Sequence, residues 1–334
     1  MPETTSHEKG ILWSIGGFVS FIILVILVVG WYWSSEPDRF DVQEEALKRA
    51  KKTDVSQLPT GYVYANTLAH IAEMLLNKPG GYITNDVMPP GLLLDDITSF
   101  EFGALIMLRD ATSALRNHLA RSQSQSAEDP DLAKAEPYFY YENDSWALPS
   151  TEKEYQKGIN ALHRYMHRLQ DKDAKVPANF YSRADNLWQY VEVIIKRLGG
   201  LSTRLQASTE RFEKQYDIVS VGLTSEQIGA AVKKTPWIDI DNVFWESRGA
   251  AWALLHILKA IKYDFRDILL DKRAMKTVDQ MILAMENALE PVLSPMILNG
   301  NGFGIFANYS LTMANYIARA NASALDLRDV MNRG

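Results

Sequence analysis

Two groups of residues in this sequence have the types and spacing that chemistry requires, and the first is a run of carboxylates. Asp95, Asp96 and Glu101 lie within seven consecutive positions, a little ahead of Asp110. Paired carboxylates hydrolyse glycosidic bonds when a fold holds them at the required separation. These residues could form a catalytic site, or the aspartates could cap the following helix while Glu101 pairs with Arg109 or another neighbour.

The second group is a histidine pair. His163 and His167 are four residues apart in a predicted helix (HRYMH), so both rings could face one metal ion. A zinc peptidase has a glutamate directly after its first histidine, whereas Arg164 occupies that position, repels a dication and supplies no base. We therefore expect a solvated or interface pair, no metal site and no cofactor.

A glycine-rich turn precedes the last predicted helix. It contains Gly300, Gly302 and Gly304 in the segment LNGNGFG. Such a turn can bind an anion through free N–H groups, but a phosphate loop also needs a preceding strand and a following Lys-Ser/Thr pair. Both are missing from this sequence, so we expect the glycines to provide the backbone freedom of an ordinary turn.

A third polar set lies on one predicted helix, over residues 237–270. It comprises Glu246, Arg248 and His256. If these side chains are buried, a satisfied polar cluster in the core is the expected arrangement, rather than a catalytic site.

The composition excludes several classes of function. The chain has 334 residues, with 35 Lys+Arg against 41 Asp+Glu, and no cysteine. A net charge of −6 argues against nucleic acid as the main partner, because phosphate binding needs a basic face. The absence of cysteine excludes disulfides, thiolate metal sites and thiol catalysis.

One segment is long and apolar enough to cross a membrane. Residues 11–33 carry no charge, and as a helix these 23 residues would span roughly 35 Å, against a hydrocarbon layer of about 30 Å. The run is too long for a cleaved signal peptide and closes on Trp31-Tyr32-Trp33 instead of a small-x-small site. We predict an N-terminal tail over 1–10 and a single transmembrane helix over 11–33.

The flanking charges bear on the side of the membrane that the rest of the chain occupies. Lys9 is the only basic residue before the span, whereas several follow it within about 20 residues: Arg39, Lys48, Arg49, Lys51 and Lys52. Counted directly, these residues would hold the large domain in the cytoplasm. Long domains translocate largely regardless of charge, however, and a ten-residue tail is easily retained. We expect the C-terminal domain to be periplasmic.

The rest of the chain is predicted to be all-α. Residues 34–60 form a juxtamembrane segment with a short charged helix over 41–52, and residues 61–334 form a helical domain of about eight helices. Apolar residues recur with a period near 3.6 in most of it, and no alternating β-branched run is long enough for a sheet. The main predicted helices cover 61–77, 100–120, 151–170, 177–216, 237–270, 274–289 and 305–331. Long irregular connections are expected at 78–97, 121–150 and 290–304.

Two finer expectations concern aromatic residues. In the last predicted helix, seven residues are expected to face inward: Phe306, Tyr309, Met313, Tyr316, Ala320, Ala324 and Leu327. The connection before residue 150 is rich in aromatic side chains, which would be interface anchors if exposed and part of the core if buried: Tyr138, Phe139, Tyr140, Tyr141 and Trp146.

Several longer motifs resemble a known bacterial family. They are Pro79-Gly80-Gly81-Tyr82, Pro89-Pro90-Gly91, Phe102-Gly103, Arg109-Asp110, Asn143-Asp144-Ser145-Trp146, Arg183-Ala184-Asp185-Asn186-Leu187, Ser294-Pro295-Met296-Ile297-Leu298-Asn299-Gly300, Phe303-Gly304 and Ala307-Asn308. From about residue 60 to its end, the chain resembles the membrane-protein family known as domain of unknown function 2333. The resemblance implies a bacterial inner-membrane protein with a helical domain, and implies no chemistry.

These observations together predict a membrane-anchored bacterial envelope protein that is not an enzyme. Its expected role is that of a scaffold or interaction protein, with the lipid bilayer and a protein of the membrane or envelope as partners. Two alternatives stay open. One is a membrane-tethered hydrolase of an envelope polymer that uses the carboxylates, and the other is a helical bundle with an apolar pocket for a lipid or small ligand.

Overall fold

The computed structural model describes residues 6–121, 128–171, 173–209, 234–294, 296–301 and 306–332. Within these ranges the protein is all-α, as predicted, and contains no strand beyond one isolated antiparallel bridge between Asn299 and Asn308. The α-helices are α1 (Ser6–Trp33), α2 (Val42–Ala50), α3 (Tyr62–Asn77), α4 (Asp95–Ala114), α5 (Leu132–Phe139), α6 (Thr151–Gln170), α7 (Ala184–Ala207), α10 (Ile240–Asp264), α11 (Arg266–Asp271), α12 (Met275–Ala288) and α13 (Tyr309–Asn332). Three short 3₁₀ turns, η1 (Val55–Gln57), η2 (Gly91–Leu93) and η4 (Trp237–Asp239), and a π-helical turn, η3 (Leu115–Leu119), complete the described elements.

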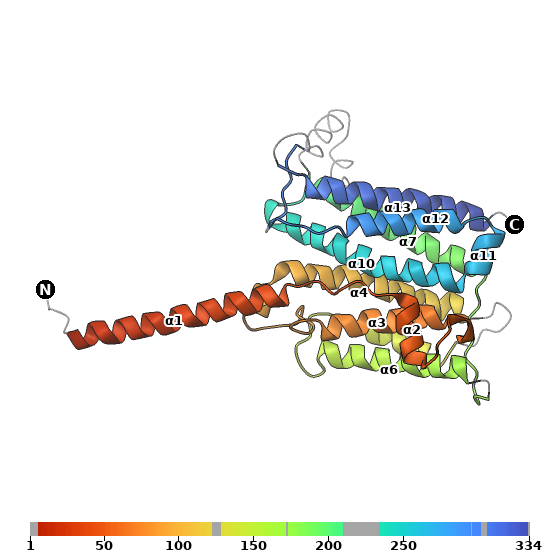
Figure 1. Ribbon diagram of the computed structural model, residues 1–334, viewed down its shortest axis with the longest axis horizontal. Coiled ribbons are helices and arrows are strands. Elements are labelled where there is room, and N and C mark those ends of the chain that lie inside the picture. Colours follow the sequence, from red (N-terminus) through yellow and green to blue (C-terminus); the bar gives the residue numbers. More distant parts are fainter. Residues whose placement is uncertain are drawn as a thin grey trace, which may run out of the picture.

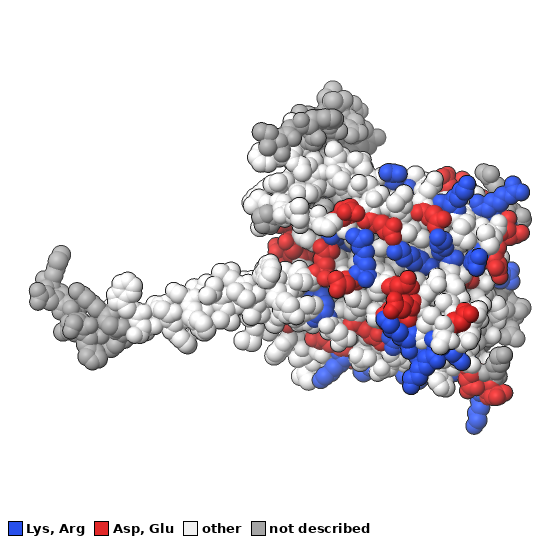
Figure 2. All heavy atoms as spheres, in the orientation of Figure 1, with Lys and Arg blue, Asp and Glu red and all other residues white. Residues whose placement is uncertain are grey.

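The helices of the domain lie side by side in a stack, with α1 projecting from one end (Figure 1). α4 and α10 pack along each other in the middle; α3 and α6 lie on one side of them, and α7, α12 and α13 on the other. α10 lies deepest, since most of its residues from Phe244 to Ile261 are buried. On the face shown in Figure 2, charged side chains of both signs cover the body of this domain, whereas α1 carries none among its described side chains.

Glycines set the separation of the two central helices. A Cβ on Gly103 in α4 would lie 1.9 Å from the carbonyl oxygen of Glu246, and a Cβ on Gly249 in α10 would lie 1.9 Å from that of Phe100. Backbone atoms cannot turn aside as a flexible side chain can. The two helices can therefore pack this closely only because both positions lack a side chain.

Replacing Gly103 with alanine is expected to lower the free energy of unfolding by about 1–3 kcal/mol, because α4 and α10 must move apart. Chemical denaturation of the full chain in detergent measures the change. Gly200→Ala in α7 is the matched control, since a Cβ there meets nothing within 4 Å. That substitution is expected to stabilise the protein by about 0.5–1 kcal/mol, and equal stabilities of the two variants would contradict the packing role of Gly103.

The helix predicted over 177–216 is shorter at its start than expected and does not break at its glycines. α7 begins at Ala184, because residues 177–183 are held in an extended path by two hydrogen bonds. The N–H of Tyr181 donates to the carbonyl of Leu119 at 2.7 Å, and the Tyr165 hydroxyl donates to that of Asn179 at 2.8 Å. The helix continues through Gly199-Gly200 to Ala207, and residues 210–216 of the prediction lie outside the described residues.

The helix predicted over 237–270 is divided at Phe265, where α10 ends and α11 begins. The division has a tertiary cause at Asp264, which is buried and accepts hydrogen bonds from the N–H groups of Gly61 and Tyr64, both at 2.7 Å. Asp264 thereby caps the start of α3 from a distant part of the chain. Burial raises the pKa of Asp264 to about 7, against the opposing effect of these two hydrogen bonds.

Two further expectations were wrong. The connection at 121–150 contains a helix, α5, because Leu132, Ala135 and Phe139 bury one face of it despite Pro137. Phe306 is exposed and precedes α13, whose first turn is capped by Asn308 through a 2.9 Å hydrogen bond from the N–H of Leu311. The later inward positions of that helix are buried as predicted: Met313, Ala320, Ala324 and Leu327.

Candidate functional site

Glu101 is buried and bound on every side. Its carboxylate lies 2.8 Å from Lys78 Nζ, and both of these side chains are almost fully inaccessible to solvent. It also accepts hydrogen bonds from the N–H groups of Ile83 and Thr84, at 3.0 and 2.8 Å, and from the Thr84 hydroxyl at 2.6 Å. Glu101 therefore fastens the loop after α3 to α4. Its ion-pair partner is Lys78 and not Arg109, which donates to the carbonyls of Phe139 and Tyr141.

The two aspartates of the same run lie at the start of α4 in a different environment. Asp95 is exposed, and Asp96 is half-buried. Burial raises the pKa of Asp96 to about 6, with smaller contributions from the nearby carboxylates of Asp241 and Asp95. The fold thus brings Asp96 close to Asp241 at the start of α10, and it places Glu101 under the loop that contains Lys78.

The two histidines do not face one ion. His163 Nε2 lies 2.9 Å from Glu73 Oε1 and 2.8 Å from Arg49 Nη1, whereas His167 is exposed. Burial acts to raise the pKa of Glu73, but hydrogen bonds from His163, His70 and Arg49 outweigh it and hold the pKa well below its usual range. No group of three metal-binding side chains suited to an ion occurs in the part of the chain that the structure describes.

The glycine-rich turn is described in part. The N–H of Gly300 donates to the carbonyl of Ala307 at 3.0 Å, and the Asn308 side chain donates to the carbonyl of Gly300 at 2.6 Å. These bonds close a turn in front of α13. Gly302 and Gly304 lie outside the described residues.

The most extensively bonded polar site joins α1 to α10. We call residues 34–41 the anchor strap, a non-helical segment that runs from the end of α1 to α2 (Figure 1). Glu36 accepts from Arg248 Nε at 2.8 Å, and Trp252 Nε1 donates to the Asp38 carbonyl at 3.3 Å. The third bond between the anchor strap and α10 comes from the N–H of Phe40, which donates to His256 Nε2 at 3.1 Å.

The bonded residues of the anchor strap match the geometry of a helix face. Positions 36, 38 and 40 contact positions 248, 252 and 256, so every second strap residue meets every fourth residue of α10. Two residues of extended chain advance about 6.6 Å and four residues of helix advance 6.0 Å. The two repeats coincide closely enough for three successive contacts, so the strap is bonded along its length.

Arg248 extends this site to α12. Its guanidinium also donates to the carbonyls of Glu290 at 2.8 Å, Ala288 at 3.2 Å and Leu289 at 3.3 Å. These carbonyls lie at the end of α12, where a helix leaves acceptors without partners. One buried side chain therefore connects the anchor strap, α10 and α12.

His256 is held in one protonation state. Its Nδ1 lies 2.7 Å from the carbonyl of Trp252 and must donate there, which leaves Nε2 as the acceptor for the N–H of Phe40. The imidazole ring of His256 and the phenyl ring of Phe40 stack with their centroids 3.9 Å apart. Burial lowers the pKa of His256 to about 3, outweighing the raising effect of the Trp252 hydrogen bond.

Acid is expected to destabilise the protein through His256. Below pH 6.5, the ordinary pKa of histidine, His256 is protonated in the unfolded chain but stays neutral in the folded chain. Stability that is present above pH 6.5 is therefore lost as the pH falls towards 3. Between pH 6.5 and 5 the loss is about 2 kcal/mol. Asp96 and Asp264, whose pKa values are raised, act in the opposite direction in both proteins. The measure is therefore the difference in the free energy of urea unfolding between the wild type and His256→Gln, which should shift by about 2 kcal/mol against the wild type between pH 6.5 and 5. The exposed His167→Gln is the control, and a profile unchanged in both variants would contradict the assignment.

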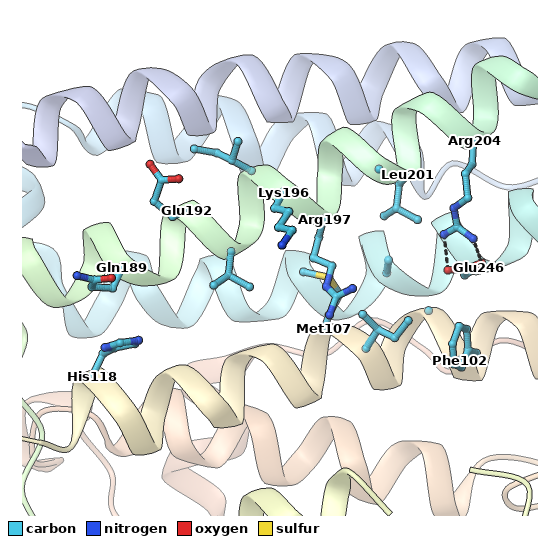
Figure 3. A pocket seen from close by; sticks show the side chains of 16 residues that line it. Phe102, Met107, His118, Gln189, Glu192, Lys196, Arg197, Leu201, Arg204 and Glu246 are labelled. Carbon is cyan, nitrogen blue, oxygen red and sulfur yellow. Dashed lines mark hydrogen bonds and ion pairs between the residues drawn. The ribbon is translucent and has the colours of Figure 1, made fainter. Parts of the chain in front are cut away.

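The principal groove lies between α4, α7 and α10 (Figure 3). It has a volume of about 1010 Å³ and is open to solvent. Apolar side chains such as Phe102, Met107 and Leu201 line it, together with charged side chains that include Arg197, Arg204 and Glu246. Arg197 contacts Asp110 at 2.5 and 3.0 Å, and Arg204 contacts Glu246 at 2.7 and 2.5 Å.

Part of these sites could be predicted from the sequence. Arg248 and His256 are buried and satisfied, as expected, but their partners are strap residues more than 200 positions earlier, and Glu246 instead lines the groove. Alternate spacing at 36, 38 and 40 was the one available signal for the strap. The same spacing occurs in any extended segment, so it could not identify α10 as the partner.

Comparison with known proteins agrees with the motifs in the sequence. The model of a family described as an uncharacterized protein conserved in bacteria (DUF2333) matches residues 6–334. No curated protein and no solved structure matches the chain.

Proposed function

The chain belongs to the uncharacterised bacterial family DUF2333, and we propose that it is a non-enzymatic envelope protein, anchored in the inner membrane by α1, that presents its domain to a partner protein. The bonded anchor strap is the observation that carries this proposal. A protein that needed only to stay near the membrane could use a flexible polar linker. Here each bonded strap residue is held to α10, which favours a role in which the position of the domain matters.

The properties of α1 support the anchor. Residues Leu12–Trp33 are long and apolar enough to cross a membrane, and their most apolar window of 18 residues is not buried inside the protein. The last turn of α1 also packs against the domain, with Gly30 beside Pro90 and Trp33 beside Gly80, and a cleaved signal peptide would need no such contacts. We propose a single-pass span with the domain in the periplasm.

The groove between α4, α7 and α10 is the proposed partner site. It combines apolar side chains with Arg197 and Arg204, which are paired with Asp110 and Glu246, and with the Lys196 side chain. This combination suits the apolar face and polar edges of a protein segment. The hydrolase alternative has less support, because Glu101 is committed to Lys78 and to the loop after α3. The groove volume does favour the second alternative, a small amphiphilic ligand.

Site-specific photo-crosslinking in cells tests the partner proposal. A benzoylphenylalanine replaces Gln189, an exposed residue that lines the groove, and Gln156 on the exposed face of α6 carries the same probe as the control. We expect one crosslinked protein from position 189 and none from position 156. Crosslinks at neither position, or to the same proteins at both, would contradict the proposal, and a crosslink to lipid alone would favour the ligand alternative.

Topology is tested separately by fusing alkaline phosphatase, or green fluorescent protein, to Gly334 in intact cells. Phosphatase activity without fluorescence is expected for a periplasmic domain. Fluorescence without phosphatase activity would overturn the periplasmic assignment and would agree with the count of basic residues after the span.

A further inference from the structure

Most of the large exposed apolar side chains of the described domain gather in four loop tips at one end. The tips are residues 87–93, 146–148, 237–238, and the described residues 293–294, 296–301 and 306, and they carry Met88, Leu93, Leu148, Trp237, Leu293 and Phe306. Three of these side chains are almost fully exposed: Leu148 at 98%, Leu293 at 93% and Trp237 at 88%. Apolar side chains exposed to this degree, and in such number, mark an interaction surface.

Contacts between the loops place the four tips at the same end of the domain. Asn85 donates to the Ser145 carbonyl, which joins the first tip to the second. Ser99 in α4 donates to Asn242 in α10, next to the third tip. The fourth tip is joined to the end of α7 by Asn299, which donates to the Ser208 carbonyl.

This is the end from which α1 projects (Figure 1). Gly30 of α1 is buried, and a Cβ on it would lie 3.4 Å from Pro90 and 3.7 Å from Leu94. Trp33 of α1 also packs against Gly80, where an added Cβ would lie 2.7 Å from the indole ring. The first tip therefore lies beside the last turn of the apolar helix, at the depth where a bilayer meets water.

Two observations favour a lipid surface over a general exposure of apolar groups. One is the far end of the domain, and the other is the charge of the residues beside the tips. At the far end of the domain, Val176 and Leu270 are about half exposed, but they are not part of a group of exposed apolar loop tips. The charged residues that flank the tips are mainly acidic, among them Asp86, Asp144, Asp239 and Glu290. An acidic surround does not attract anionic lipid, so contact with a bilayer here would depend on the apolar side chains.

We propose that these four loop tips insert into the interfacial layer of the bilayer that α1 crosses, so that the domain rests on the membrane by its end. The inference depends on the proposed membrane span, because the bilayer is the one surface that α1 necessarily brings to this end. The bonded anchor strap maintains the contact by fixing the angle between α1 and the domain. Burial of the apolar side chains drives this insertion, so it requires no anionic lipid and occurs on zwitterionic lipid.

The absence of cysteine makes the test direct, since each single-cysteine variant of the full chain carries one environment-sensitive fluorophore. The loop-tip positions are Leu93→Cys, Leu148→Cys and Leu293→Cys, and the far-end controls are Val176→Cys and Leu270→Cys. Phe21→Cys, within α1, reports on the span itself. The labelled proteins are reconstituted into phosphatidylcholine vesicles with nitroxide-labelled lipids that quench either near the headgroups or near the bilayer centre.

We expect blue-shifted emission and loss of intensity with the headgroup-level quencher at the three tips, and water-like emission without quenching at the two controls. Water-like emission at the tips, with Phe21→Cys quenched at the bilayer centre, would overturn the insertion while the span stands. An unquenched Phe21→Cys would instead contradict the membrane span. Quenching at the tips that requires added anionic lipid would overturn the hydrophobic mode of contact.

Discussion

Replacing Glu101 with glutamine is expected to lower the free energy of unfolding by about 3–5 kcal/mol, because the change leaves the buried Lys78 ammonium without its counter-charge. The amide is nearly isosteric with the carboxylate, but its NH₂ group opposes the N–H groups of Ile83 and Thr84, which now donate to oxygen. Chemical denaturation of the full chain in detergent, followed by circular dichroism, measures the loss.

Asp95→Asn is the matched control, since Asp95 is exposed on the same helix, and its effect is expected to stay within about 0.5 kcal/mol. The double variant Lys78→Met/Glu101→Gln should recover part of the stability, because it removes the unpaired ammonium and keeps an amide oxygen that can accept from the N–H groups of the loop. If Glu101→Gln is as stable as the wild type, Glu101 does not have the structural role assigned to it here, and a catalytic role becomes the better interpretation.

Arg248→Met is expected to release the anchor strap. The substitution keeps the length of the side chain but removes the partner of Glu36 and the donors to the end of α12. A loss of about 3 kcal/mol corresponds to a 100-fold rise in the population of the open strap. Trypsin should then cleave after Arg39 about 100 times faster and separate α1 from the domain, which gel electrophoresis follows directly.

Lys262→Met is the control for this experiment, because Lys262 lies on the same helix and forms an exposed ion pair with Asp279. That pair is expected to contribute less than about 1 kcal/mol, so cleavage after Arg39 should stay close to the wild-type rate. Equal cleavage rates in the two variants would show that Arg248 does not hold the strap. The anchor would then be a flexible tether, and the proposed function would lose the observation that carries it.

The anchor strap and the loop tips have related consequences for function. A bonded strap transmits the orientation of α1 to the domain, and under the proposed membrane span the apolar tips lie on the side nearest the bilayer. The groove between α4, α7 and α10 then has a defined direction relative to the bilayer. A partner that binds this groove would meet the domain in one orientation.

Local chemistry accounts for what could be read from the sequence. Helix hydrogen bonds join residues four positions apart, so apolar residues that recur with a period near 3.6 indicate most helices within a few positions. The expectations that were wrong lie where a distant segment outweighs local preference. At Asp264 that segment is the start of α3, and at Pro137 it is the core that covers α5.

The sequence by itself determined the class of the protein: an apolar N-terminal helix, a helical domain, no cysteine chemistry and membership of one bacterial family. Only the tertiary structure decided the partners of its polar groups. Glu36 meets Arg248 and Glu101 meets Lys78 through packing of segments that are remote in sequence or separated by a loop. Such pairings depend on where whole helices lie, and the local pattern of residues does not carry that information.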